Sequence, residues 1–153
     1  MKILVLNGPN LNMLGVREPA IYGRKTYADV VAEIEEKARE LQVECAVKQS
    51  NHEGALVDMI QSAYHEGVDG IVINPAAYTH TSVAIADALK TVSIPTVEIH
   101  ISDPDTRESF RHVSYIRPIV IATVKGEGTD GYLHALTLLV EYLNEKAAKF
   151  DIR

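Results

Sequence analysis

The chain has 153 residues, of which 46% are hydrophobic and 24% charged, so it suits one globular domain rather than a disordered protein. Its net charge of −6 and its lack of Lys or Arg runs argue against nucleic acid and membrane surfaces as partners. Cys45 is the only cysteine, which excludes a disulfide framework and favours a reduced, cytoplasmic location. The apolar stretch at residues 1–6 is too short for a signal peptide or a membrane span and is expected to form a strand.

Short apolar runs alternate along the chain with amphipathic segments of helical period. Capping boxes predict two helix starts, at Thr26 with Asp29 and at Ser50 with Glu53. In chain order, the predicted elements are a strand at 3–6, a helix at about 26–41, a strand at 43–48, a helix after Ser50, a strand at 68–73, a helix at 82–89, strands at 96–101 and 116–124, and a helix from about Thr129.

Repeated strand, helix, strand units favour a parallel sheet, because each crossover returns the chain to the same end of the sheet. We therefore predict an α/β fold, a doubly wound, flavodoxin-like three-layer sandwich whose parallel strands have the order 2-1-3-4-5. No linker or internal repeat divides the sequence, so residues 1–153 are expected to form a single domain. Pro118 cannot donate a hydrogen bond to a sheet, which suggests that the fifth strand lies at an edge.

Polar residues follow three of the predicted strands, in segments 7–12, 74–81 and 98–103. In doubly wound sheets, ligands bind beyond the carboxyl ends of the strands. Amides, hydroxyls and imidazoles gathered at this edge predict a site for a small polyhydroxylated molecule, which they would bind by hydrogen bonds.

Glu98 and His100 are two residues apart on a predicted strand, so their side chains point to the same face. The carboxylate can accept a hydrogen bond from one ring nitrogen and leave the other for proton transfer. The alternative is a structural pair in which Glu98 only satisfies a buried histidine.

The segment at 15–25 is long for a connection in a compact domain, and such loops often act as lids. It holds Tyr22 together with Arg17 and Arg24. A guanidinium near a phenol favours the phenolate, so Tyr22 is a candidate base. The alternative is a surface loop with one packed aromatic ring.

Two further patterns are judged to be misleading. Residues 126–131 match the glycine-rich dinucleotide fingerprint, but no strand follows the helix that they open, so we predict a tight turn and a helix start there. The six histidines lack the short spacing of a metal site, so no metal is predicted.

Taken together, the motifs resemble those of type II 3-dehydroquinate dehydratases along nearly the whole chain. The matching motifs are NGPNLN at 7–12, REP at 17–19, IYG at 21–23, QSNHEG at 49–54, NPAAYTHTS at 74–82, EIHIS at 98–102 and FRH at 110–112. The resemblance implies anti elimination of water from 3-dehydroquinate through an enolate to give 3-dehydroshikimate. It also implies that no metal, Schiff base or other cofactor takes part. The reaction serves the shikimate pathway or quinate breakdown.

The resemblance implies a catalytic role for five residues. Tyr22 corresponds to the base, and Arg17 to the arginine of the lid loop. Asn12 corresponds to the residue that positions a water for the enolate oxygen. His100, oriented by Glu98, corresponds to the acid that protonates the departing hydroxyl.

The substrate-binding positions that the resemblance implies are Asn74, His80, Asp87, Ile101, Ser102 and Arg111. Ile101 and Ser102 would hold the substrate carboxylate, whereas His80 and Arg111 would meet ring hydroxyls. Asp87 matches a residue that reaches the site of a neighbouring subunit, and the family usually forms a dodecamer built from trimers. A homo-oligomer is therefore expected.

Some positions depart from the common pattern of the family. Ala76 stands where glycine is frequent, Asp103 where asparagine is frequent, and Arg117, Pro118 and Lys125 lie in a region that is often smaller or more apolar. The rival class is a noncatalytic flavodoxin-like module, either a flavin carrier or a phosphorylated receiver. The first predicted strand ends in amides, which favours neither a phosphate loop nor an acidic cluster. A binding protein without activity is a third alternative.

Overall fold

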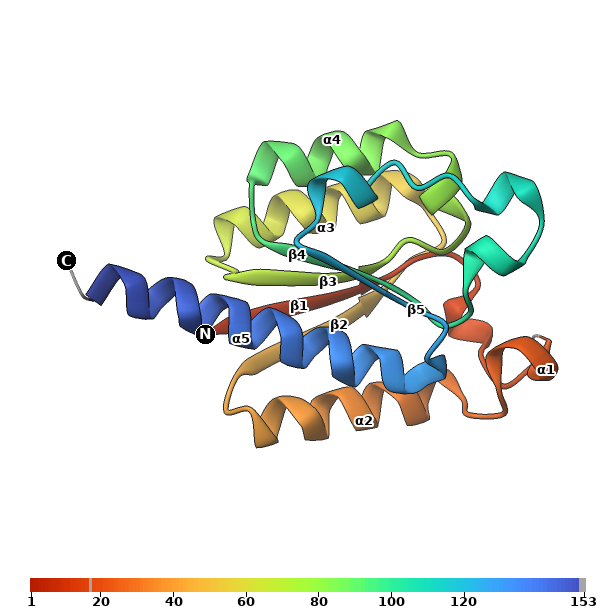
Figure 1. The fold of residues 1–153 in the computed structure, drawn as a ribbon, viewed down its shortest axis with the longest axis horizontal. Helices are drawn as coiled ribbons and strands as arrows, with labels where there is room; N and C mark the ends of the chain where they lie inside the picture. Colours follow the sequence, from red (N-terminus) through yellow and green to blue (C-terminus); the bar gives the residue numbers. More distant parts are fainter. Residues whose placement is uncertain (17, 152–153) are drawn as a thin grey trace.

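The centre of the molecule is a parallel sheet with the strand order β2-β1-β3-β4-β5 (Figure 1). The computed structural model describes residues 1–16 and 18–151, without the side chains of Tyr22 and Asp151. The strands are β1 (Lys2–Asn7), β2 (Glu44–Gln49), β3 (Gly70–Asn74), β4 (Thr96–His100) and β5 (Ala122–Lys125). The predicted fold class and strand order are confirmed.

Helices cover both faces of the sheet (Figure 1). One face carries α2 (Tyr27–Glu40) and α5 (Gly131–Asp151), and the other carries α3 (Glu53–His65) and α4 (Val83–Val92). Alternate residues of β1 enter the two cores: Ile3 and Val5 pack with α2 and α5, whereas Leu4 and Leu6 pack with α3 and α4. A strand that is buried on both faces therefore reads as a continuous apolar run.

The two predicted helix starts have different outcomes. At α2 the Thr26 hydroxyl accepts from the Asp29 amide, and the Asp29 carboxylate accepts from the Thr26 amide, so this capping box is confirmed. The box at Ser50 is wrong, because α3 begins at Glu53 after His52. The Ser50 amide is already bonded to the Asn7 carbonyl beyond the end of β2, so Ser50 still continues the strand.

The fifth strand is shorter than predicted. Residues Arg117–Ile119 form a short 3-10 helix, η5, and β5 occupies only Ala122–Lys125. Pro118 lies in the first turn of η5, where no amide donor is needed, and not in the strand. β5 is at an edge, as predicted, but Pro118 is not the reason.

The segment at 126–131 forms the predicted tight turn and leads into the last helix. Gly126 and Gly128 have positive φ values of 75° and 66°, which glycine adopts without a steric penalty. Their amides donate to the carbonyls of Ser102 and Ile101, which joins the end of β4 to the start of α5.

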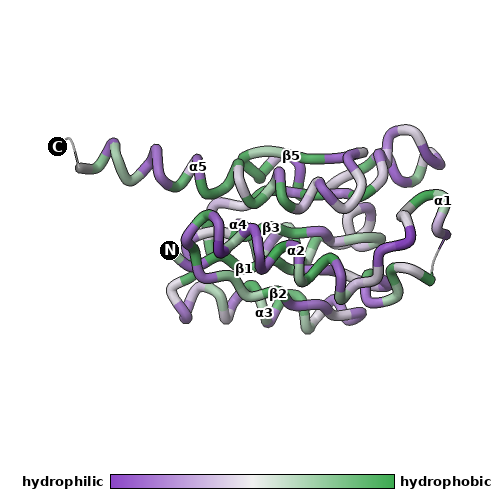
Figure 2. The backbone as a smooth tube through the Cα atoms, turned by 90° about the horizontal axis from the view of Figure 1, so that it is seen from below, coloured by the Kyte–Doolittle hydropathy of each residue, from purple (hydrophilic) through white to green (hydrophobic). Residues whose placement is uncertain are grey.

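α5 extends beyond the sheet at the end opposite the carboxyl ends of the strands (Figures 1 and 2). Hydrophilic and hydrophobic residues alternate along it in Figure 2, as expected for a helix with one packed face. Among the described residues, no helix combines the length and the apolar character needed to cross a membrane.

Candidate active site

A pocket lies at the carboxyl ends of the strands, where the sequence predicts a site. It contains about 480 Å³ of empty space, part of which is open to solvent. Six of the predicted site residues line it together: Asn74, His80, His100, Ile101, Ser102 and Arg111. Asn74 and His100 end strands β3 and β4 at the same edge, because parallel neighbours end on the same side of the sheet, and the other four residues lie in the segments that follow these two strands.

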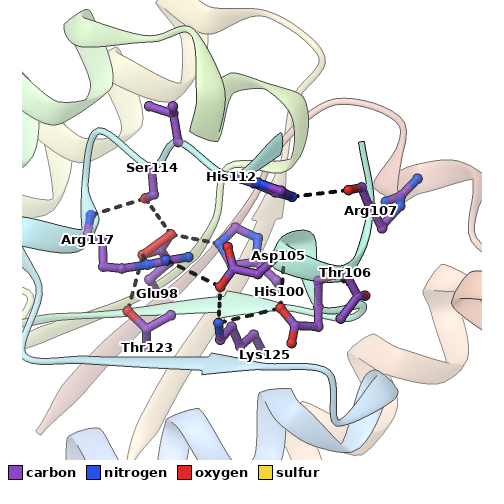
Figure 3. Close-up of polar contacts among 12 residues, drawn as sticks. Glu98, His100, Asp105, Thr106, Arg107, His112, Ser114, Arg117, Thr123 and Lys125 are labelled. Atoms are coloured by element: carbon purple, nitrogen blue, oxygen red, sulfur yellow. Dashed lines mark hydrogen bonds and ion pairs between the residues drawn. The ribbon is translucent and has the colours of Figure 1, made fainter. Parts of the chain in front are cut away.

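Glu98 and His100 form a buried pair on β4 (Figure 3). Glu98 is 0% exposed, and its Oε1 accepts a hydrogen bond of 2.7 Å from His100 Nε2. The Ser114 hydroxyl donates to the same oxygen at 2.7 Å, and the Thr123 hydroxyl donates to Oε2 at 3.3 Å. The predicted contact is therefore present, and His100 also lines the pocket.

The surroundings keep Glu98 ionised. Burial, the largest influence, raises the pKa of Glu98, but the hydrogen bond and charge of His100, the Ser114 hydroxyl and the charge of Arg117 together hold it below its usual value. A negative carboxylate behind the imidazole orients the ring through the hydrogen bond to Nε2. This arrangement suits an acid that delivers a proton into the pocket.

His80 is held as a neutral hydrogen-bonding group. It belongs to the short 3-10 helix η2 (Ala76–His80), and its Nδ1 donates to the Val113 carbonyl at 2.6 Å. Burial is the main reason that the pKa of His80 is lowered. Nε2 then remains to accept a hydrogen bond, as contact with a hydroxyl group requires.

Two arginines line the pocket, and one of them was not predicted. Arg111 lies in η4 (Ser109–Arg111) and donates through Nε to Glu108 at 2.7 Å. Arg107 follows η3 (Pro104–Thr106) and donates through Nη1 to the Ser102 hydroxyl at 3.4 Å. A signal was available in the sequence, because Arg107 follows the polar end of a predicted strand and precedes Arg111 by one helical turn. Both cations are placed to attract an anionic ligand.

Asn74 is held by a buried network that sequence reasoning missed. Its Nδ2 donates to the Tyr132 hydroxyl at 3.0 Å, and its Oδ1 accepts from the Ala76 amide at 3.1 Å. The Tyr132 hydroxyl donates to Asn7 Oδ1 at 2.6 Å. Burial raises the pKa of Tyr132, so this residue remains a neutral donor. The network connects β1, β3 and α5 beneath the pocket.

Replacing Tyr132 with phenylalanine should lower the free energy of unfolding by about 1–3 kcal/mol, because buried amide groups of Asn7 and Asn74 lose a partner. Thermal or urea unfolding measures the change. Tyr142→Phe on the same helix is the control, since Tyr142 is 39% exposed and should tolerate the loss of its hydroxyl. Equal stability of the Tyr132 variant and the wild type would contradict the importance of the network.

Ala76 has a left-handed backbone, with φ of 53°. This conformation costs a residue with a Cβ about 1–2 kcal/mol, whereas glycine adopts it freely. Glycine would therefore suit this position better than alanine. The strain lies in the pocket wall.

Ala76→Gly should raise the free energy of unfolding by roughly 0.5–1 kcal/mol, after allowing for the greater freedom of glycine in the unfolded chain. Differential scanning calorimetry should show a melting temperature higher by about 1–4 °C. Ala84→Gly, at an exposed position of α4, should instead be destabilising, because glycine weakens a helix. A change of the same sign in both variants would argue against strain at Ala76.

The remaining predicted residues lie outside the pocket lining or outside the described residues. Asn12 is in η1 (Leu11–Met13), beside the pocket-lining Leu11, and its Oδ1 accepts from Gln49 at 3.3 Å. Asp87 is exposed on α4, away from the pocket lining. Arg17 and the side chain of Tyr22 lie outside the described residues. The backbone of α1 (Pro19–Tyr22) lies at the pocket end of the molecule (Figure 1).

No group of three His, Cys, Asp or Glu side chains suited to holding a metal ion occurs within residues 1–16 and 18–151. The polar groups around the pocket are instead suited to hydrogen bonding and proton transfer.

The fold and the pocket define a class of protein: a doubly wound α/β protein with an imidazole and carboxylate pair equipped for acid–base chemistry. The family model described as dehydroquinase class II matches residues 1–140. The chain belongs to this family.

Individual relatives support the family assignment. The chain is 52% identical over 147 residues to a 3-dehydroquinate dehydratase of Lachnospira eligens, covering 95% of this chain and 100% of the relative. It is similar to the crystal structure of a type II dehydroquinase from Butyrivibrio crossotus, with a TM-score of 0.90 and 51% identity, over 94% of this chain and 97% of that one. The corresponding structure from Propionibacterium acnes has a TM-score of 0.87 and 44% identity, over 92% and 96% of the two chains.

Proposed function

We propose that the protein dehydrates 3-dehydroquinate to 3-dehydroshikimate, in the shikimate pathway or in quinate breakdown. The observation that carries the proposal is the buried pair of Glu98 and His100 at the wall of a polar pocket, in a chain of the dehydroquinase class II family. Relatives about half identical in sequence bear the name of this activity.

In the proposed reaction, Tyr22 as phenolate removes a proton from the carbon next to the ketone, and Arg17 favours its ionised form. The electron pair moves to the ketone oxygen to give an enolate, which hydrogen-bonds to a water positioned by Asn12. When the enolate collapses, the carbon–carbon double bond forms and the hydroxyl departs. His100 gives that hydroxyl its proton, and water is released. No metal or cofactor takes part in the proposed steps.

The substrate carboxylate is proposed to bind at the Ile101 amide and the Ser102 hydroxyl. The guanidinium of Arg107, bonded to that hydroxyl, supports this orientation. His80 and Arg111 are assigned to ring hydroxyls, and both line the same pocket. Asn74 is the last residue of the proposed binding set, and its side chain is held in place by the hydrogen bond to Tyr132.

Residues 1–153 are proposed to act as one catalytic domain, with the loop at 15–25 as its lid. The protein is further proposed to be a homo-oligomer, a dodecamer built from trimers, working in the cytoplasm. Asp87, which is exposed on α4, is the residue proposed to reach another subunit. Light scattering of the purified protein measures the assembly, and a monomeric mass would remove this part of the proposal.

The activity is tested by incubating the purified protein with 3-dehydroquinate and following the ultraviolet absorbance of the conjugated product. Turnover is expected without added metal, and it should persist with a chelator present. Borohydride added with substrate should not inactivate the protein, because no lysine imine is formed. Absence of product would reject the proposed function.

A further inference from the structure

A chain of ion pairs connects the buried carboxylate of Glu98 to the surface (Figure 3). Arg117 Nε lies 3.9 Å from Glu98 Oε2, and Arg117 Nη1 lies 3.8 Å from Asp105 Oδ2. Lys125 binds Asp105 and lies 3.5 Å from Asp103 Oδ1. One guanidinium is thus shared between a carboxylate at the active site and a carboxylate of the loop that follows β4.

The contact between Arg117 and Glu98 acts through charge. Arg117 Nε is buried, and among the described residues it has no hydrogen-bond partner. The two oxygens of Glu98 already accept from His100, Ser114 and Thr123. Arg117 therefore contributes a positive charge close to Glu98 without replacing any of the hydrogen bonds that hold the carboxylate in place.

We propose that Arg117 is a positioning residue for the acid–base pair: by dividing its charge between Glu98 and Asp105, it sets how strongly Glu98 holds the proton of His100. The inference deepens the proposed function and rests on it, since His100 is the proposed acid. Arg117 touches neither the pocket nor the reacting atoms, so its effect passes through Glu98.

The direction of the effect follows from the signs of the charges. A bare carboxylate beside an imidazole favours the protonated ring, because opposite charges attract strongly where little water screens them. The positive charge of Arg117, on the opposite oxygen of the same carboxylate, weakens that attraction. Its side chain is 35% exposed, so solvent reduces the effect without abolishing it.

Other charged groups surround the pair and are unchanged in the Arg117 variants. They are His80 on η2, Arg107 and Arg111 at the pocket, His112 beside Arg107, and Lys125 with its partners Asp103 and Asp105. Of these, Asp105 competes directly for Arg117. Removing Asp105 should therefore leave more of the Arg117 charge acting on Glu98.

The test is the pH profile of kcat for 3-dehydroquinate in the wild type, Arg117→Gln and Arg117→Lys. The alkaline limb reports the loss of the proton from the acid, so it should move to higher pH by about half a unit or more in Arg117→Gln. Arg117→Lys keeps the positive charge, so its alkaline limb should lie closer to that of the wild type. KM should change less than kcat, because Arg117 does not contact the pocket.

The matched control is Arg39→Gln, which removes an exposed arginine paired with Glu36 on α2 and should leave the profile unchanged. Asp105→Asn should move the limb to lower pH, and by less when combined with Arg117→Gln, since part of its effect passes through Arg117 and the rest through its other partner, Lys125. If Arg117→Gln fails to fold, Asp105→Asn decides. The inference is overturned if the alkaline limb does not move in a folded Arg117→Gln variant. Where that variant does not fold, an unmoved limb in Asp105→Asn overturns it.

A titration of the His100 ring by nuclear magnetic resonance separates this inference from the proposed function, because it needs no substrate. The midpoint for His100 should rise in Arg117→Gln relative to the wild type. If the wild type does not dehydrate 3-dehydroquinate, the proposed function fails and the titration still tests the coupling. If the wild type is active, but its pH profile and its His100 titration are the same as those of Arg117→Gln, only the proposed role of Arg117 fails.

Discussion

Tyr22→Phe should fold normally and lose nearly all turnover of 3-dehydroquinate. The substitution removes a single oxygen, and with it the phenolate that is proposed to take the proton next to the ketone. General acid–base groups contribute about 10²–10⁴-fold, so kcat should fall by at least about 100-fold. Steady-state kinetics with product absorbance measures the loss, and calorimetry checks that the fold is retained.

Tyr64→Phe is the matched control for this experiment, because Tyr64 is 62% exposed on α3 and far from the pocket lining. It should keep the wild-type rate. A Tyr22→Phe protein that retains a tenth or more of the wild-type kcat would remove Tyr22 from the role of base. A variant that does not fold would instead favour the alternative reading of Tyr22 as a packed ring in a surface loop.

His100→Ala should also reduce kcat, by about 10²–10⁴-fold, because the departing hydroxyl loses its proton donor. Binding of the substrate should be weakened much less, since the other groups of the pocket remain. Equilibrium binding of a substrate analogue and single-turnover kinetics separate the two effects. A loss of affinity with unchanged kcat would contradict the assignment of His100 as the acid.

The stability of this variant should depend on pH in a predictable direction. Because the pKa of Glu98 is lowered on folding from the usual 4.5, its interactions stabilise the wild type above that pH, and the stabilisation disappears as the pH falls through the lower folded value. In His100→Ala the largest influence that opposes burial is gone, so the folded pKa of Glu98 is less depressed and less stability should be lost as the pH falls below 4.5. Unfolding of both proteins measured between pH 7 and pH 3 shows the difference.

Removing one partner of a buried ion pair costs up to about 3–5 kcal/mol, so His100→Ala could unfold. Combining it with Glu98→Gln removes the unpaired charge and should recover stability without recovering kcat. A double variant that regains both would mean that the pair has only a structural role.

Much of the fold was predictable because its signals are local. Apolar runs on β1 and β3 mark strands that are covered on both faces, and the Thr26 box marks the start of α2. The Ser50 box failed because the Ser50 amide bonds to β1, a neighbour that no local pattern reveals. β5 was overextended because an apolar stretch with a proline fits both a strand and the turn of η5.

The sequence by itself determined the contact of Glu98 with His100, since a strand repeats every second residue and places both on one face. It also determined which polar segments meet, because parallel strands end at the same edge. Only the tertiary structure decided that Tyr132 holds Asn74, which is 58 residues away, and that Arg117 lies between Glu98 and Asp105. Those meetings depend on how α5 and η5 pack against the sheet, and packing follows from the whole core rather than from any local period.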